Sequence, residues 1–168
     1  MLALSLIVIG ILLRFAPHAP NFTPVAAIAL FGAVYLNRKY ALIIPLLLMI
    51  ASDIFIGMHN VVFFTWGGFI LITLLGFWLK KNKSISRIIA SSLASALLFF
   101  IVSNFGVWVM GWYPHTLKGL VNCYIMGLPF LRNFTLATLC FVALFFGAYE
   151  LIARRVKDTK LAKVFLTI

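Results

Sequence analysis

The sequence predicts an all-α membrane protein, and three observations lead to that fold class. Of the 168 residues, 64% are hydrophobic and only 10% are charged, and the mean hydropathy is +1.14. Soluble domains average about 45–50% apolar and about 25% charged residues. The apolar residues fall into six runs, and the basic residues collect in alternate connections between those runs. We therefore expect residues 1–168 to form a single transmembrane domain, a six-helix bundle, and not a soluble enzyme or a disulfide scaffold.

The six predicted helices follow in chain order. The first covers residues 1–14 and lacks the basic start and the cleavage site of a signal peptide. The second covers 24–36 and begins at Pro24, a residue that suits the first turn of a helix. The others are predicted at 40–57, 61–79, 86–112 and 130–153. An outer loop at 113–129 joins the last two, and 154–168 form a basic cytoplasmic tail.

The basic residues predict the orientation of the bundle. Eleven of the 14 Lys and Arg residues lie in the second connection, the fourth connection and the C-terminal tail, whereas Arg14, Lys118 and Arg132 lie on the other side. Because basic residues accumulate in cytoplasmic loops, this split places both termini in the cytoplasm. The net charge of +11 is then a consequence of topology, and nucleic acid is not expected as a partner.

Polar and ionisable residues gather in the outer connections. Such groups are costly near apolar spans and usually face a cavity or a partner, so we expect a ligand pocket open to the outside. Asp53 ends an apolar run, and either a structural salt bridge or a ligand contact explains it equally well. The candidate ligand-binding residues are Arg14, His18, Asn21, Asp53, His59, Asn104, Trp108, His115, Tyr124, Arg132 and Asn133.

Three further features carry weaker predictions. The three histidines and Cys123 have side chains that suit Zn, Co or Ni, but their spacing matches no compact metal motif. Ala29 and Ala33 form a small-xxx-small pair, which serves either packing within the bundle or docking of another membrane subunit. No P-loop or nucleophile motif is present in the sequence, so any ATPase that drives transport is expected to be another protein.

Three segments of the sequence carry a resemblance to known proteins. They are Arg14 to Ala27 (RFAPHAPNFTPVAA), Ser52 to His59 (SDIFIGMH) and Cys123 to Asn133, which contains PFLRN. The chain resembles a family of small bacterial integral-membrane proteins that is similar to the S components of energy-coupling-factor transporters. The nearest characterised relatives look like the BtuM-type cobalamin transporters.

This resemblance implies a bacterial inner-membrane protein that binds a vitamin under its outer loops, with cobalamin or another corrinoid as the leading ligand. It implies docking to a transmembrane coupling subunit with two ATPases. His18, Asp53 and Arg132 match its corrinoid contacts. Residues 54–68 contain no cysteine, so His59 or Cys123 would be the axial cobalt ligand.

The sequence therefore predicts a transport subunit and no catalytic residues, with three alternatives. In the first alternative, the ligand of the S component is a different vitamin or a metal ion. In the second, the chain is a membrane enzyme that acts on a lipid or quinone headgroup, with Asp53 and a histidine as acid and base. In the third, the chain is a membrane scaffold whose outer loops bind a partner protein.

Overall fold

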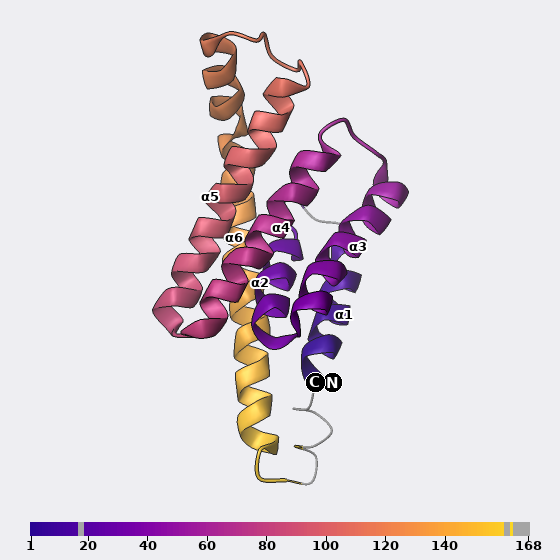
Figure 1. Cartoon of the computed structure of the whole chain (residues 1–168), viewed down its shortest axis with the longest axis vertical. Helices are drawn as coiled ribbons and strands as arrows, with labels where there is room; N and C mark the ends of the chain where they lie inside the picture. The colour runs from indigo at the N-terminus through magenta and orange to yellow at the C-terminus, as the bar shows by residue number, and fades with distance from the viewer. Residues whose placement is uncertain (17–18, 160–161, 163–168) are drawn as a thin grey trace.

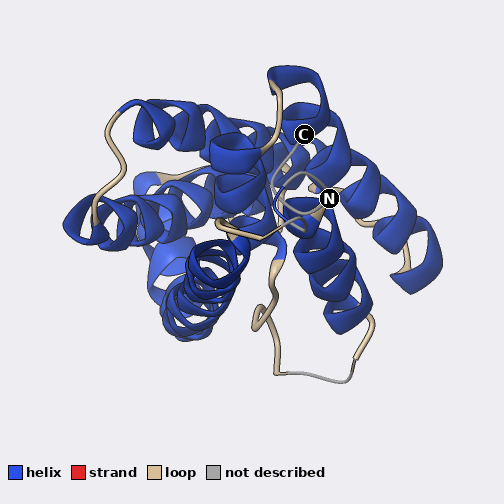
Figure 2. Ribbon diagram, turned by 90° about the horizontal axis from the view of Figure 1, so that it is seen from below, coloured by secondary structure: helices blue, strands red, loops and turns tan. Residues whose placement is uncertain are grey.

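The computed structural model describes residues 1–16, 19–159 and 162, and the described residues form six helices and no strand (Figure 2). The all-helical prediction is confirmed. Three helices, α4, α5 and α6, are long and apolar enough to cross a membrane, which indicates a membrane protein. The helices are α1 (Leu2–Arg14), α2 (Val25–Tyr35), α3 (Arg38–Ile56), α4 (Val62–Lys81), α5 (Ile85–Val109) and α6 (Leu117–Val156).

The last helix corrects the sequence prediction. Residues 113–129 were expected to form an outer loop, but α6 begins at Leu117 and continues for 40 residues, into the predicted tail. Thr116 caps its start, because its hydroxyl oxygen accepts a hydrogen bond from the Gly119 amide at 3.1 Å. Pro129, read from the sequence as preceding a helix start, lies inside α6. The α5–α6 hairpin therefore extends past the α3–α4 connection (Figure 1).

Helix α2 occupies the centre of the bundle, with the other five helices packed around it (Figure 1). It has only 11 residues, and its side chains from Val25 to Phe31 have no exposed surface. A helix that is apolar on every side is stable only when it is buried on every side. The sequence of α2, which contains no charged residue, fits that position.

The small residues of α2 serve packing within the chain. Ala29 and Ala33 were predicted to serve either packing within the bundle or docking of another subunit. Both are fully buried, so they pack within the bundle and present no surface to another subunit. Gly76 of α4 lies directly against this face. A Cβ atom on Gly76 would lie 2.5 Å from the Cβ of Ala33 and 3.2 Å from the carbonyl oxygen of Leu30. The two helices approach so closely because neither carries a larger side chain at this point.

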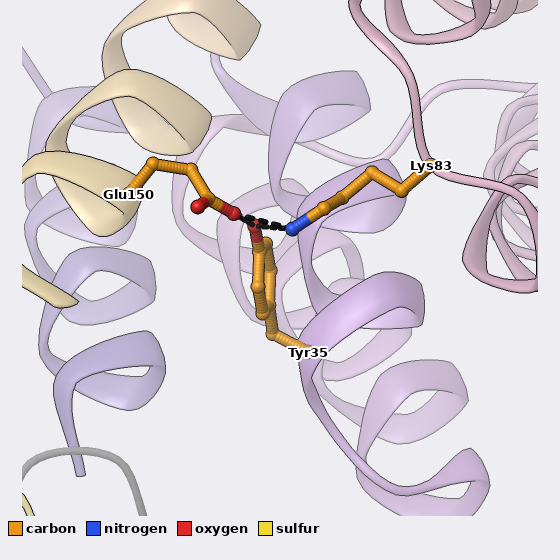
Figure 3. A network of polar contacts seen from close by, with 3 residues as sticks. All are labelled: Tyr35, Lys83 and Glu150. Atoms are coloured by element: carbon orange, nitrogen blue, oxygen red, sulfur yellow. Dashed lines mark hydrogen bonds and ion pairs between the residues drawn. The ribbon is translucent and has the colours of Figure 1, made fainter. Parts of the chain in front are cut away.

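A polar network closes the bundle at the C-terminal end of α2. The hydroxyl of Tyr35 donates to Oε1 of Glu150 at 2.7 Å and accepts from Nζ of Lys83 at 2.8 Å, and Lys83 also pairs with Glu150 (Figure 3). Nearby, Nζ of Lys80 donates to the carbonyl oxygen of Leu36 at 3.0 Å. These contacts join α2, the α4–α5 connection and α6.

Substituting Gly76 tests the close approach of α2 and α4. Gly76→Ala should lower the free energy of unfolding by about 1–3 kcal/mol, because the added methyl group overpacks the contact with Ala33. Thermal unfolding in detergent measures the change. Gly67→Ala in the same helix is the control, since a Cβ there meets nothing within 4 Å. Equal stability of the two variants would contradict the packing described.

Removing the Tyr35 hydroxyl tests the polar network. Tyr35→Phe should destabilise the fold by about 1–3 kcal/mol, because Lys83 and Glu150 both lose a hydrogen-bond partner. Tyr149→Phe is the matched control. The Tyr149 ring lies 3.9 Å from that of Tyr35, and its hydroxyl has no hydrogen-bond partner in the described part of the chain. If both variants unfold at the same temperature as the wild type, the network does not stabilise the bundle.

Candidate functional site

A cavity of about 110 Å³ lies at the N-terminal end of α2, opposite the Tyr35 network. Every helix contributes to its wall, and so do the α1–α2 and α3–α4 connections. The lining residues are Arg14, Asn21, Thr23, Val25, Met49, Asp53, His59, Thr65, Phe69, Phe99 and Phe134. The lining therefore combines polar and ionisable side chains with three phenylalanines.

Asp53 is the acidic residue of this cavity, and the fold holds it in place. It lies in the last turns of α3, and only 3% of its surface is exposed. Its Oδ2 accepts a hydrogen bond of 2.8 Å from the indole Nε1 of Trp66 on α4. A buried carboxylate needs such a donor, because nothing else replaces the hydrogen bonds to water that it loses on burial. The bond also fixes the end of α3 against the start of α4.

Arg14 supplies the positive charge of the cavity. It is the last residue of α1, and its Nη1 donates to Oγ1 of Thr23 at 3.4 Å, just before α2 begins. Its guanidinium group lies close enough to Asp53 for electrostatic attraction. The cavity therefore contains opposite charges from α1 and α3.

His59 and the start of α2 add further polar groups. His59 is half-buried in the α3–α4 connection, and its buried Nδ1 has no hydrogen-bond partner among the described atoms. The N-cap of α2 is Pro24, which makes no side-chain hydrogen bond to the helix. The first-turn amides of a helix carry a partial positive charge, so this end of α2 favours a negative group. Together these groups are suited to bind a small solute with a charged end.

The floor of the cavity is a cluster of three phenylalanines. The rings of Phe99 and Phe134 stack with centroids 4.6 Å apart, and the ring of Phe69 lies 4.8 Å from that of Phe99. They come from α5, α6 and α4. Phe69 and Phe134 belong to the buried core of the bundle, and Phe99 packs against it, so the cavity borders the core.

The cavity brings together four residues that the sequence predicted as ligand-binding, two of them at helix ends and two in connections. These are Arg14, Asn21, Asp53 and His59. His18, another predicted residue, lies outside the described residues. Trp66 was missed in the sequence analysis. A signal for it existed, because the N–H group of a buried tryptophan needs a hydrogen-bond acceptor, and Trp66 follows a connection that contains polar residues. The aromatic floor could not be distinguished from ordinary core residues.

The other predicted residues lie mostly in the α5–α6 hairpin, where they bond to the hairpin itself. Nε1 of Trp108 donates to the Pro114 carbonyl at 3.0 Å, and Nε2 of His115 lies 2.9 Å from the Trp108 carbonyl oxygen. The Tyr124 hydroxyl donates to the Ile101 carbonyl at 2.8 Å. These contacts fix the tip of the hairpin, and none of the three residues lines the cavity.

Three predicted residues lie along the base of the hairpin. The Asn104 side chain donates to the Phe100 carbonyl at 2.8 Å and lines a second cavity of about 20 Å³, which has room for roughly one water molecule. Asn133 donates to the Pro20 carbonyl at 3.1 Å and so holds the α1–α2 connection against α6. Arg132 is exposed and lines neither cavity.

The two alternative cobalt ligands lie in different parts of the fold. Cys123 is buried in the hairpin, with its Sγ 3.3 Å from the Asn104 carbonyl oxygen, whereas His59 lines the larger cavity. Within the described ranges, no group of three or more His, Cys, Asp or Glu residues is arranged to hold a metal ion. Of the two candidate axial ligands, only His59 lines the larger cavity.

The chain belongs to the DUF6580 family, a family of unknown function, whose sequence profile it matches over residues 1–161. No curated protein and no solved structure matches the chain significantly.

Substituting Trp66 tests the bond that holds Asp53. Trp66→Phe should lower the free energy of unfolding by about 1–3 kcal/mol, because the carboxylate loses its donor while it stays buried. Thermal unfolding of Trp66→Phe, Asp53→Asn and the double variant forms a cycle that isolates the coupling between the two residues. Trp78→Phe is the control, since Trp78 is 56% exposed. A coupling energy near zero would contradict the contact.

Proposed function

We propose that the chain is a solute-binding membrane protein, the substrate-binding subunit of a micronutrient uptake system of the S-component type. Its binding site is the cavity that contains Arg14, Asp53 and His59. One observation carries this proposal: three ionisable side chains from α1, α3 and the α3–α4 connection converge on one cavity within a predominantly apolar bundle. Ionisable groups in such a position are expensive, and they usually mark a substrate or ion pathway.

The charges of the cavity favour a ligand with a negative group. Arg14 and the uncapped start of α2 both attract an anion, and they lie next to each other through the Arg14–Thr23 contact. Asp53, across from them, would attract a cationic group on the same ligand. The phenylalanine floor would contact its apolar part. A small carboxylate or a zwitterion is thus the chemistry that fits best.

Size sets a second condition on the ligand. A cavity of about 110 Å³ is smaller than the engineered cavity of about 150 Å³ that binds benzene, so it accommodates only a small group. A corrinoid, the ligand implied by the sequence resemblance, is far larger. It would bind only after the helices around the cavity separate, whereas a small micronutrient would fit without such a change.

Transport would need an energy source outside this chain. The resemblance to S components suggests a transmembrane coupling subunit with two ATPases, and both termini of this chain would then lie in the cytoplasm. Because Ala29 and Ala33 are buried, the docking surface for that subunit would lie on another face of the bundle. The protein would bind the solute at the outer side and then move within the membrane. It would catalyse no reaction.

Binding to the purified protein tests this proposal. We expect the detergent-solubilised full chain to gain thermal stability from acetate or glycine but not from ethylammonium, three probes of similar size and different charge. Ultraviolet–visible spectra with cobalamin and cobinamide test the corrinoid: retention of a shifted spectrum after desalting would assign that ligand and require opening of the cavity.

A matched pair of variants locates the site. His59→Gln should weaken binding of whichever probe stabilises the wild type by about 10-fold, the equivalent of roughly one lost hydrogen bond. His115→Gln makes the same substitution in the hairpin, outside the cavity, and should bind like the wild type. Equal effects of the two variants, or no stabilisation by any probe, would contradict the proposed site.

A further inference from the structure

The described cations of the bundle are concentrated at one end. The α2–α3 connection, the α4–α5 connection and the C-terminal part of α6 all lie toward the lower end of Figure 1. The polar network confirms this placement, because Lys83 contacts both Tyr35 and Glu150. Nine described cations lie here against two carboxylates, Glu150 and Asp158, a net charge of +7. They are Arg38, Lys39, Lys80, Lys81, Lys83, Arg87, Arg154, Arg155 and Lys157. We call this set the basic end.

Part of the basic end is used by the fold. Lys80 and Lys83 bind the Leu36 carbonyl and the Tyr35–Glu150 pair, and Arg87 donates to the Asn82 carbonyl at 3.1 Å. The guanidinium group of Arg38 lies over the Phe77 ring at 5.7 Å. These contacts hold the connections together and keep the other cations in a fixed arrangement.

Five exposed cations remain. Arg154 is attracted electrostatically to Glu150, one turn earlier on α6, and the other four have no such use. The side chains of Lys39, Lys81, Arg155 and Lys157 make no hydrogen bond or ion pair with any described residue. Packing, capping and ion pairing therefore do not account for them. They come from α3, α4 and the end of α6, so three segments far apart in the sequence present charge at one end of the bundle.

Two aromatic residues mark the depth of this surface. Tyr40 follows Lys39 on α3 and is 55% exposed, and Trp78 lies one turn before Lys81 on α4 and is 56% exposed. Exposed Tyr and Trp at the ends of apolar helices are typical of the level of lipid headgroups. The free cations then lie at the level of the lipid phosphates, where an anionic leaflet attracts each Lys or Arg.

We propose that the basic end binds anionic phospholipid headgroups through Lys39, Lys81, Arg155 and Lys157. The headgroup phosphates contact these four cations, and the acyl chains lie beside Tyr40 and Trp78. The neighbouring cations that the fold uses add to the positive potential but are not released from their own partners. The interaction is independent of whether the outer cavity binds a solute.

A lipid titration of the full chain tests this proposal. In dodecyl maltoside, phosphatidylglycerol should raise the melting temperature, whereas phosphatidylcholine at the same mole fraction should not. Lys39→Gln/Lys81→Gln should raise the phosphatidylglycerol needed for half of the effect about 25-fold, since each cation contributes about fivefold. The further change of Arg155 and Lys157 to Gln should abolish the effect. Because the fold does not use these four side chains, the variants should unfold like the wild type without lipid.

Control variants and soluble anions define the outcomes that would overturn the proposal. Lys118→Gln/Arg132→Gln removes the same charge from the opposite end and should respond to phosphatidylglycerol like the wild type. An equal loss in that control would mean that only net charge matters. Equal stabilisation by phosphatidylcholine would mean that the headgroup charge is not recognised. Stabilisation by glycerol phosphate at the same phosphate concentration would assign a soluble anion instead of a lipid.

Discussion

The structure depends on one constraint, the complete burial of a helix that is too short to cross the bundle. With 11 residues, α2 is about 16 Å long, roughly half of the hydrocarbon thickness of a bilayer. Both of its ends therefore lie within the depth of the protein, where unpaired backbone groups are costly. Polar side chains must reach both ends. Lys80 binds the Leu36 carbonyl at one end, and Arg14 and Thr23 lie at the other.

The two polar sites of the molecule follow from that constraint. At the C-terminal end of α2, the donors and acceptors satisfy one another in the network of Tyr35, Lys83 and Glu150. At the N-terminal end, the N-cap residue Pro24 makes no side-chain hydrogen bond to the helix, and a cavity lined by Arg14 and Asp53 remains. The first arrangement is closed and structural. The second leaves space beside ionisable side chains, which is why we assign the solute to it.

Much of the fold could be predicted from the sequence, because hydrophobic run length is a strong signal in a membrane chain. All six predicted segments contain a helix, and the grouping of the basic residues at one end appears in the structure. The continuation of α6 through residues 117–129 could not be predicted from Pro129 and the glycines, which ordinarily interrupt helices. Gly127 permits close contact with Asn104 of α5, a tertiary reason that local sequence does not contain.

The site was also predictable only in part, because tertiary packing decides which of the predicted residues meet. Polar residues in and beside the α1–α2 and α3–α4 connections are conspicuous in a predominantly apolar chain, so Arg14, Asn21, Asp53 and His59 could be selected by type and position. Which of the outer residues meet depends on helix packing. The hairpin residues Trp108, His115 and Tyr124 are of equally suggestive types, yet they bond to nearby carbonyl groups. The pairing of Asp53 with Trp66 joins two helices and follows from no spacing rule.

The length of α6 has a consequence for the membrane around the protein. Its apolar stretch between Arg132 and Glu150 comprises residues 133–149, about 26 Å of helix, although the whole helix of 40 residues extends about 60 Å. The stretch that suits hydrocarbon is thus shorter than an average bilayer core of about 30 Å. A thin bilayer would match it with little distortion, whereas a thick one would have to thin locally around α6. The protein would therefore be sensitive to the hydrophobic thickness of the bilayer around it.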